Sequence, residues 1–133
     1  MTLRRRRLPE DLQAPATALD ELLPVLERAK TALTQAVPGT RLPGRPLAEA
    51  LWAFETDLRD VEVLMAAWRT PEVETEWAAA SVGLFETLGL AERLRTTGGE
   101  PRGFEELIGV IGDLLAPLEA FEAAAARFRE LRR

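Results

Sequence analysis

The sequence predicts an all-α fold: an antiparallel up-and-down four-helix bundle with helices at about 16–37, 46–69, 71–96 and 102–131. Apolar residues recur along each of these ranges at alternating steps of three and four, which is the spacing of a helix that buries one side. No stretch alternates apolar and polar residues as a strand does. The links between the ranges contain Pro and Gly and are short, which favours antiparallel neighbours. We expect residues 1–15 to form a basic tail and lead-in segment, and residues 16–133 to form one helical domain.

The first predicted helix begins near Thr17, a residue suited to capping, with Asp20 three positions later. Its buried side is predicted to comprise Leu19, Leu22, Leu26, Ala29, Leu33 and Ala36. Pro24 falls opposite that side, so we expect it to face solvent. The connection at 38–46 contains three prolines and two glycines and is predicted to be irregular.

The second and third helices meet at Thr70-Pro71-Glu72. The buried sides are predicted to comprise Leu47, Leu51, Phe54, Leu58, Val61, Met65 and Trp68 on one helix, and Val73, Trp77, Ala80, Leu84, Leu88, Ala91 and Leu94 on the other. Because Pro disfavours helix at the preceding residue, we predict a sharp turn. The alternative is one long helix with a kink at Pro71.

The fourth predicted helix has the longest uninterrupted apolar pattern: Phe104, Leu107, Ile111, Leu114, Leu118, Phe121, Ala125 and Phe128. Ile108, Val110 and Leu115 widen its apolar side, which predicts a central position in the bundle. Pro117 removes one backbone donor, so we expect a bend there.

The composition excludes several kinds of chemistry. Cys, His and Tyr are all absent, which excludes disulfides, thiolate metal sites and histidine-dependent catalysis. The net charge of −5 disfavours a nucleic-acid footprint over the whole domain. No apolar run reaches the roughly 20 residues of a membrane span, and no secretory signal follows the basic start. We therefore expect a cytoplasmic protein without a cofactor.

Several large apolar residues fall outside the predicted buried sides. Trp52 and Val63 do so on the second helix, and Val82 and Phe85 do so on the third. Gly109 and Gly112 lie away from the buried side of the fourth helix, where they would allow close approach of another helix. We predict that these six residues contact another protein or a second copy of the chain, since large exposed apolar patches mark contacts. The alternative is that the 38–46 connection or the N-terminal segment covers the large side chains.

Arginines form a second candidate surface. Arg4, Arg5, Arg6 and Arg7 are consecutive, and Arg41 and Arg45 lie in the 38–46 connection. Such a cluster could hold phosphate groups of nucleic acid or of an anionic surface. No aromatic residue is interleaved with the four consecutive arginines, so base stacking has no platform there.

Carboxylates allow a third interpretation. Asp57-x-x-Asp60 and Glu119-x-x-Glu122 have a spacing similar to the acid pairs with which some all-helical nucleotide pyrophosphohydrolases bind Mg²⁺. The helical repeat, however, places Asp60 and Glu119 outward, and it predicts that Glu55 and Arg59 form a surface ion pair. The sequence therefore favours a non-enzymatic interaction or adaptor protein that self-associates. A nucleic-acid or anionic-surface accessory protein and a Mg²⁺-dependent nucleotide hydrolase are the alternatives.

Overall fold

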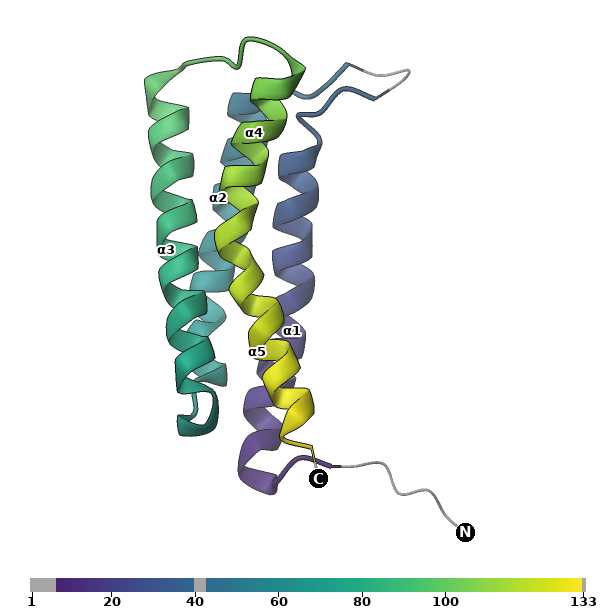
Figure 1. The fold of residues 1–133 in the computed structure, drawn as a ribbon, viewed down its shortest axis with the longest axis vertical. Helices are drawn as coiled ribbons and strands as arrows, with labels where there is room; N and C mark the ends of the chain where they lie inside the picture. The colour runs from purple at the N-terminus through teal and green to yellow at the C-terminus, as the bar shows by residue number, and fades with distance from the viewer. Residues whose placement is uncertain (1–6, 40–42, 133) are drawn as a thin grey trace.

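The computed structural model describes residues 7–39 and 43–132, which form four helical rods (Figure 1). The first rod is α1 (Glu10–Thr34), and the second is α2 (Leu47–Leu64) continued by the 3₁₀ segment η1 (Met65–Trp68). The third is η2 (Pro71–Val73) followed by α3 (Glu74–Thr97). The fourth comprises α4 (Phe104–Leu115), η3 (Ala116–Glu119) and α5 (Ala120–Glu130). The predicted all-α class is confirmed, and no strand occurs within the described ranges.

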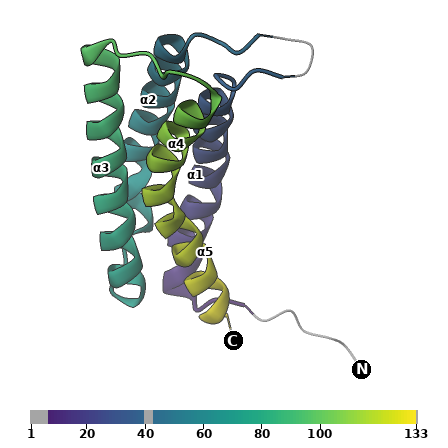
Figure 2. The ribbon, with the colours of Figure 1, turned by 45° about the horizontal axis from the view of Figure 1, so that its top comes forward.

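Successive rods run in opposite directions. In Figure 1 the colours pass upward along α1, downward along α2, upward along α3 and downward along α4 and α5. Contacts between rods agree with these directions, because residue numbers rise along one rod as they fall along its neighbour. The second and third rods pair Met65 with Trp77 and Glu55 with Arg95. The third and fourth rods pair Glu76 with Arg127 and Thr87 with Leu114. Figure 2 shows the same four rods after a 45° rotation, with α3 at one side.

The core follows the predicted apolar pattern along most of its length. The largest fully buried side chains include Trp68, Phe54, Phe121, Leu22 and Leu118, and they come from every rod except the third. α3 contributes smaller buried residues, among them Ala80, Gly83 and Ala91. The rings of Trp68 and Phe121 lie 6.2 Å apart at an angle of 51°, a favourable arrangement for aromatic pairs.

The start of α1 differs from the prediction. The helix begins at Glu10 rather than near residue 16, so Thr17 is an interior residue and not a cap. Leu8 and Leu12 are buried and continue the apolar spacing of α1 toward the N-terminus. Pro15 lies inside the helix, where its missing N–H removes only one backbone bond near the end. Pro24 is exposed, as predicted.

The sharp turn at Pro71 is confirmed. Arg69 and Thr70 are both extended, with φ and ψ of −75° and 120° and of −142° and 156°, so the helix is interrupted. The indole Nε1–H of Trp77 donates to the carbonyl of Met65 at 2.9 Å, which fixes the third rod against the second. At the other end of α3, Gly98 adopts a left-handed φ of 66° and ends the helix.

Pro117 interrupts the fourth rod at a close contact with α3. The chain tightens into η3 there, and a Cβ placed on Gly83 of α3 would overlap the carbonyl oxygen of Pro117. The buried hydroxyl of Thr87, one turn further along α3, donates to the carbonyl of Leu114 at 3.0 Å. Glycine therefore allows the two backbones to approach, and the threonine pairs a carbonyl next to the interruption.

Candidate contact surface

The four large apolar residues that the sequence places outside the core are all at the surface. Trp52, Val63, Val82 and Phe85 keep 62%, 80%, 56% and 79% of their area exposed. Neither the described part of the 38–46 connection nor the described start of the chain buries them. Their exposure is confirmed, and their role as contact residues stays a prediction.

These residues belong to two helices that pack against each other. Trp52 and Val63 share one side of α2, because eleven residues correspond to about three turns. Val82 and Phe85 are close neighbours on α3, and α2 packs directly against α3. We call the surface formed by these four side chains and the hollow between the two helices the α2–α3 outer face.

A hollow of about 410 Å³ lies between α2 and α3 and is mainly apolar. It is lined by Met65, Ala66, Trp77, Leu84 and Phe85, with Glu62, Arg69 and Ser81 contributing polar atoms. An exposed ring and a hollow of this size therefore adjoin one another on the same face.

Arg69 lines this hollow and forms an ion pair with Glu74. The Nη2 and Nε atoms of Arg69 donate to the two carboxylate oxygens of Glu74 at 2.7 and 3.0 Å. These hydrogen bonds hold the pKa of Glu74 below its ordinary value and raise the pKa of Arg69. The guanidinium also lies 4.1 Å from the centre of the Trp77 ring, a cation–π distance. The orientation of Trp77 is thus fixed by Arg69 on one side and by the bond to Met65 on the other.

Glu55 and Arg95 join α2 to α3 near Trp52. Nε and Nη2 of Arg95 donate to the Glu55 carboxylate at 2.7 and 3.3 Å, and this bond raises the pKa of Arg95. Glu55 is buried, so the predicted surface pair of Glu55 with Arg59 is wrong. Periodicity alone does not show that a cation on the neighbouring helix lies closer. The Arg95 guanidinium lies 5.2 Å from the centre of the Trp52 ring and supports this exposed side chain.

The first half of α4 is more exposed than predicted. Phe104 and Ile108 are 58% and 42% exposed, so the central position expected for this helix is wrong at its N-terminal end. Gly109 and Gly112 are exposed, and a Cβ at either position would meet no atom within 4 Å. No other described residue packs closely against either glycine, and their contact with another protein stays a prediction.

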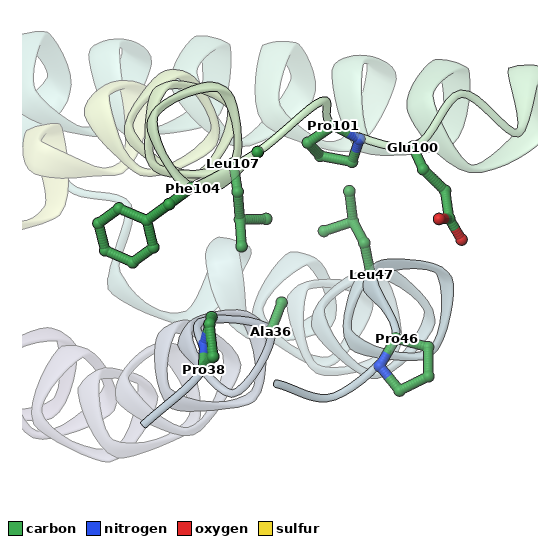
Figure 3. A pocket seen from close by; sticks show the side chains of 9 residues that line it. Ala36, Pro38, Pro46, Leu47, Glu100, Pro101, Phe104 and Leu107 are labelled. Atoms are coloured by element: carbon green, nitrogen blue, oxygen red, sulfur yellow. The ribbon is translucent and has the colours of Figure 1, made fainter. Parts of the chain in front are cut away.

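A second apolar hollow lies at this end of the bundle (Figure 3). Its volume is about 280 Å³, and it is lined by Ala36, Pro38, Pro46, Leu47, Glu100, Pro101, Gly103, Phe104 and Leu107. Figure 3 shows Leu107 and Leu47 pointing toward each other across it, with Phe104 to one side. This hollow was not predicted from the sequence, although prolines at three helix ends were a signal that the packing there would be irregular.

The predicted anion-contact arginines are only partly described. Arg4, Arg5, Arg6 and Arg41 lie outside the described residues. Arg45 contacts Glu49 at 3.4 Å and Gln35 at 3.3 Å. Arg7 is exposed and lines a polar hollow of about 430 Å³ together with Arg132, which the sequence analysis did not connect with it.

The carboxylates proposed for Mg²⁺ do not come together. Asp57 accepts from Nε of Arg28 at 3.2 Å, and Asp60 forms an ion pair with Nη2 of the same guanidinium at 3.6 Å. Glu119 and Glu122 are exposed on the fourth rod. Among the described residues no group of three or more His, Cys, Asp or Glu has the proximity needed for a metal ion. These contacts do not favour the hydrolase alternative.

The fold and the surface together define a small helical bundle whose α2–α3 outer face is apolar and exposed. No described helix combines the length and apolar character needed to span a membrane. Comparisons with protein-family models, curated proteins and solved structures found no match.

Proposed function

We propose that this chain is a non-enzymatic helical interaction protein, a self-associating small subunit of a larger assembly in the cytoplasm. One observation carries the proposal: Trp52, Val63, Val82 and Phe85 are exposed on two adjacent helices, although the core has buried most other large apolar side chains. Large apolar side chains exposed on neighbouring helices are typical of sites of contact with other proteins.

The chemistry of the remaining side chains supports the same proposal. The chain has no His, Cys or Tyr, the residues that most often act as general bases, nucleophiles or redox groups. The buried carboxylate Glu55 is paired with Arg95. Binding through surface complementarity requires none of these reactive groups.

Two charge substitutions test the proposal. Trp52→Glu and Phe85→Glu place a charge on the α2–α3 outer face, where it would be desolvated in a contact, so each is expected to reduce the mass observed by sedimentation. Thr31→Glu, on the exposed side of α1, is the matched control. Circular dichroism should show unchanged helicity for all three. If both variants keep the mass of the unaltered protein, these residues do not mediate self-association.

A second candidate function has one specific observation in its favour. Arg7 and Arg132, from opposite ends of the chain, line the same polar hollow with Gln13, Thr17 and Asp20. The observation supports an accessory role in which this end of the bundle binds nucleic acid or another polyanion, although Asp20 would oppose it.

Salt dependence tests this second candidate. We expect binding to single-stranded DNA or to anionic vesicles to weaken steeply between about 50 and 200 mM salt if phosphate contacts carry it. The double variant Arg7→Gln with Arg132→Gln should reduce that dependence, whereas Arg59→Gln, on the exposed side of α2, should not. Binding that does not change with salt, or no binding at low salt, would exclude this function.

A further inference from the structure

α3 buries one apolar side and also exposes two large apolar side chains on the side away from the core. Ala80, Leu84 and Ala91 are buried against the other rods, while Val82 and Phe85 point away and are exposed. Glu86, Glu92 and Arg93 are also exposed on α3, so its outer side is apolar only around Val82 and Phe85. Two large apolar side chains exposed close together on one helix are typical of a contact with another protein.

The α2–α3 outer face carries both a protruding ring and a place to receive one. Phe85 stands at the rim of the 410 Å³ hollow, whose walls are formed by Trp77, Leu84 and Met65. That volume falls in the range of pockets that hold small organic molecules, so a phenyl ring fits. Two identical surfaces related by a two-fold axis must be complementary to themselves. The exposed Phe85 ring lies beside a hollow that can accept the same ring of another copy, so this face can be complementary to itself.

We infer that the occupant of this face is a second copy of the chain, related by a two-fold axis, with the Phe85 ring of each copy seated beside Trp77 of the other. This inference rests on the self-association proposed above and specifies its surface and symmetry.

The charges at the rim are consistent with a two-fold arrangement. Glu62 and Arg69 both line the hollow, with Glu62 in the last turn of α2 and Arg69 just after the end of the second rod. When two such rods lie antiparallel across a two-fold axis, the acidic end of one hollow faces the basic end of the other. Arg69 donates to Glu74 through Nε and Nη2, and its Nη1 remains for a carboxylate of the second copy.

The exposed apolar area is large enough to form the centre of an interface between two copies. Trp52 and Phe85 together expose on the order of 300 Å², given about 150–250 Å² for a whole aromatic side chain. Val63, Val82 and the walls of the hollow add to this. The sum stays below the roughly 800 Å² that each partner contributes to a stable interface of standard size, so the polar residues around these side chains would be buried as well.

Engineered cysteines test the inference directly, because the chain has no cysteine of its own. Ser81 lines the hollow next to Phe85, so Ser81→Cys places a thiol near the expected two-fold axis. Thr31→Cys places one on the exposed side of α1 as the matched control. A short bis-maleimide should link two Ser81→Cys chains efficiently and should leave Thr31→Cys chains unlinked. Phe85→Glu in the Ser81→Cys background should abolish the link and weaken association by at least about thirtyfold, the effect of a typical hot-spot residue.

The outcomes separate this inference from the proposal on which it rests. A dimeric mass with linking at Ser81→Cys alone supports both. A dimeric mass with linking at Thr31→Cys alone, or with no effect of Phe85→Glu, overturns the two-fold surface and leaves self-association standing. A mass of one chain at every concentration overturns both.

Discussion

α1 and α3 are nearly equal in length, at 25 and 24 residues, yet their outer sides differ in kind. The inner side of each is packed against the core. The outer side of α1 carries residues suited to water: Gln13, Asp20, Glu21, Pro24, Glu27, Arg28 and Thr31. The outer side of α3 carries charged residues too, among them Glu86, Glu92 and Arg93, but it also exposes Val82 and Phe85 beside small residues such as Ala78. The comparison indicates that the outer side of α1 is suited to solvent, whereas the outer side of α3 includes large apolar side chains suited to contact with another protein.

The largest difference in unfolding free energy should appear between substitutions of a buried residue and of an exposed one. Leu22→Ala removes a fully buried side chain of α1 and is expected to cost about 2–5 kcal/mol of unfolding free energy. Phe85→Ala should change the stability of the single chain by less than about 0.5 kcal/mol, since the ring is mostly exposed. Urea unfolding at high dilution, where association is minimal, measures both. Equal losses would contradict the assignment of Phe85 to an outer side.

Added volume on the inner side of α3 should lower the free energy of unfolding, just as lost volume does on the inner side of α1. Gly83→Ala places a methyl group against the carbonyl of Pro117, a backbone atom, and is expected to cost about 1–3 kcal/mol. Gly89→Ala on the same helix meets only Nη1 of Arg93, at 3.5 Å, so it should gain up to about 1 kcal/mol of helix propensity. Thermal unfolding distinguishes them. Stabilisation by both substitutions would show that α3 and the fourth rod can separate at Pro117.

A smaller effect is expected from the buried hydroxyl of Thr87. Thr87→Val keeps the shape of the side chain but leaves the carbonyl of Leu114 without that donor, at a cost of about 1 kcal/mol. Thr31→Val on the exposed side of α1 should have almost no effect on unfolding by urea. An equally small effect at Thr87 would mean that the carbonyl finds another partner.

The smallest effect should come from Glu74, and it should depend on pH. Hydrogen bonds from Arg69 keep the pKa of Glu74 below its ordinary value, so the folded state favours the ionised carboxylate. The stabilising contribution is therefore present above the ordinary pKa of glutamate and is lost as the pH falls through the lowered pKa.

Glu74→Gln isolates this contribution. Glu74→Gln should be less stable than the unaltered chain at pH 7, and the difference should vanish in strong acid. Glu10→Gln in the first turn of α1, where the structure gives the acid no ion pair with a described residue, controls for the helix dipole. A difference that persists unchanged in acid would exclude the carboxylate of Glu74 as its source.

Periodicity predicted the inner sides of the rods well because buried helical positions repeat regularly. The buried residues of α1 from Leu19 to Leu33 and those of α2 from Leu51 to Val61 fall where the spacing placed them. The outer position of Phe85 followed from the same repeat. Local chemistry was sufficient as well for the turn at Pro71, since the residue before proline is driven out of the helical region.

Features that depend on where a neighbouring rod ends could not be predicted in this way. Phe104 has the spacing of a buried residue. As the first residue of α4, however, it lines the hollow of Figure 3 and stays exposed. The earlier start of α1 was missed because Thr17 was taken as the capping residue, although Leu12 continues the apolar spacing. The hollow beside Trp77 requires the relative placement of α2 and α3, which spacing along one helix does not contain.

The central claim is that the outer side of α3 is covered by another copy of the chain. The mass of the unaltered protein in solution, measured by light scattering over a dilution series, tests it most directly. We predict twice the 14.7 kDa mass of one chain at high concentration, falling toward the mass of one chain on dilution. A mass of 14.7 kDa throughout the series would contradict it.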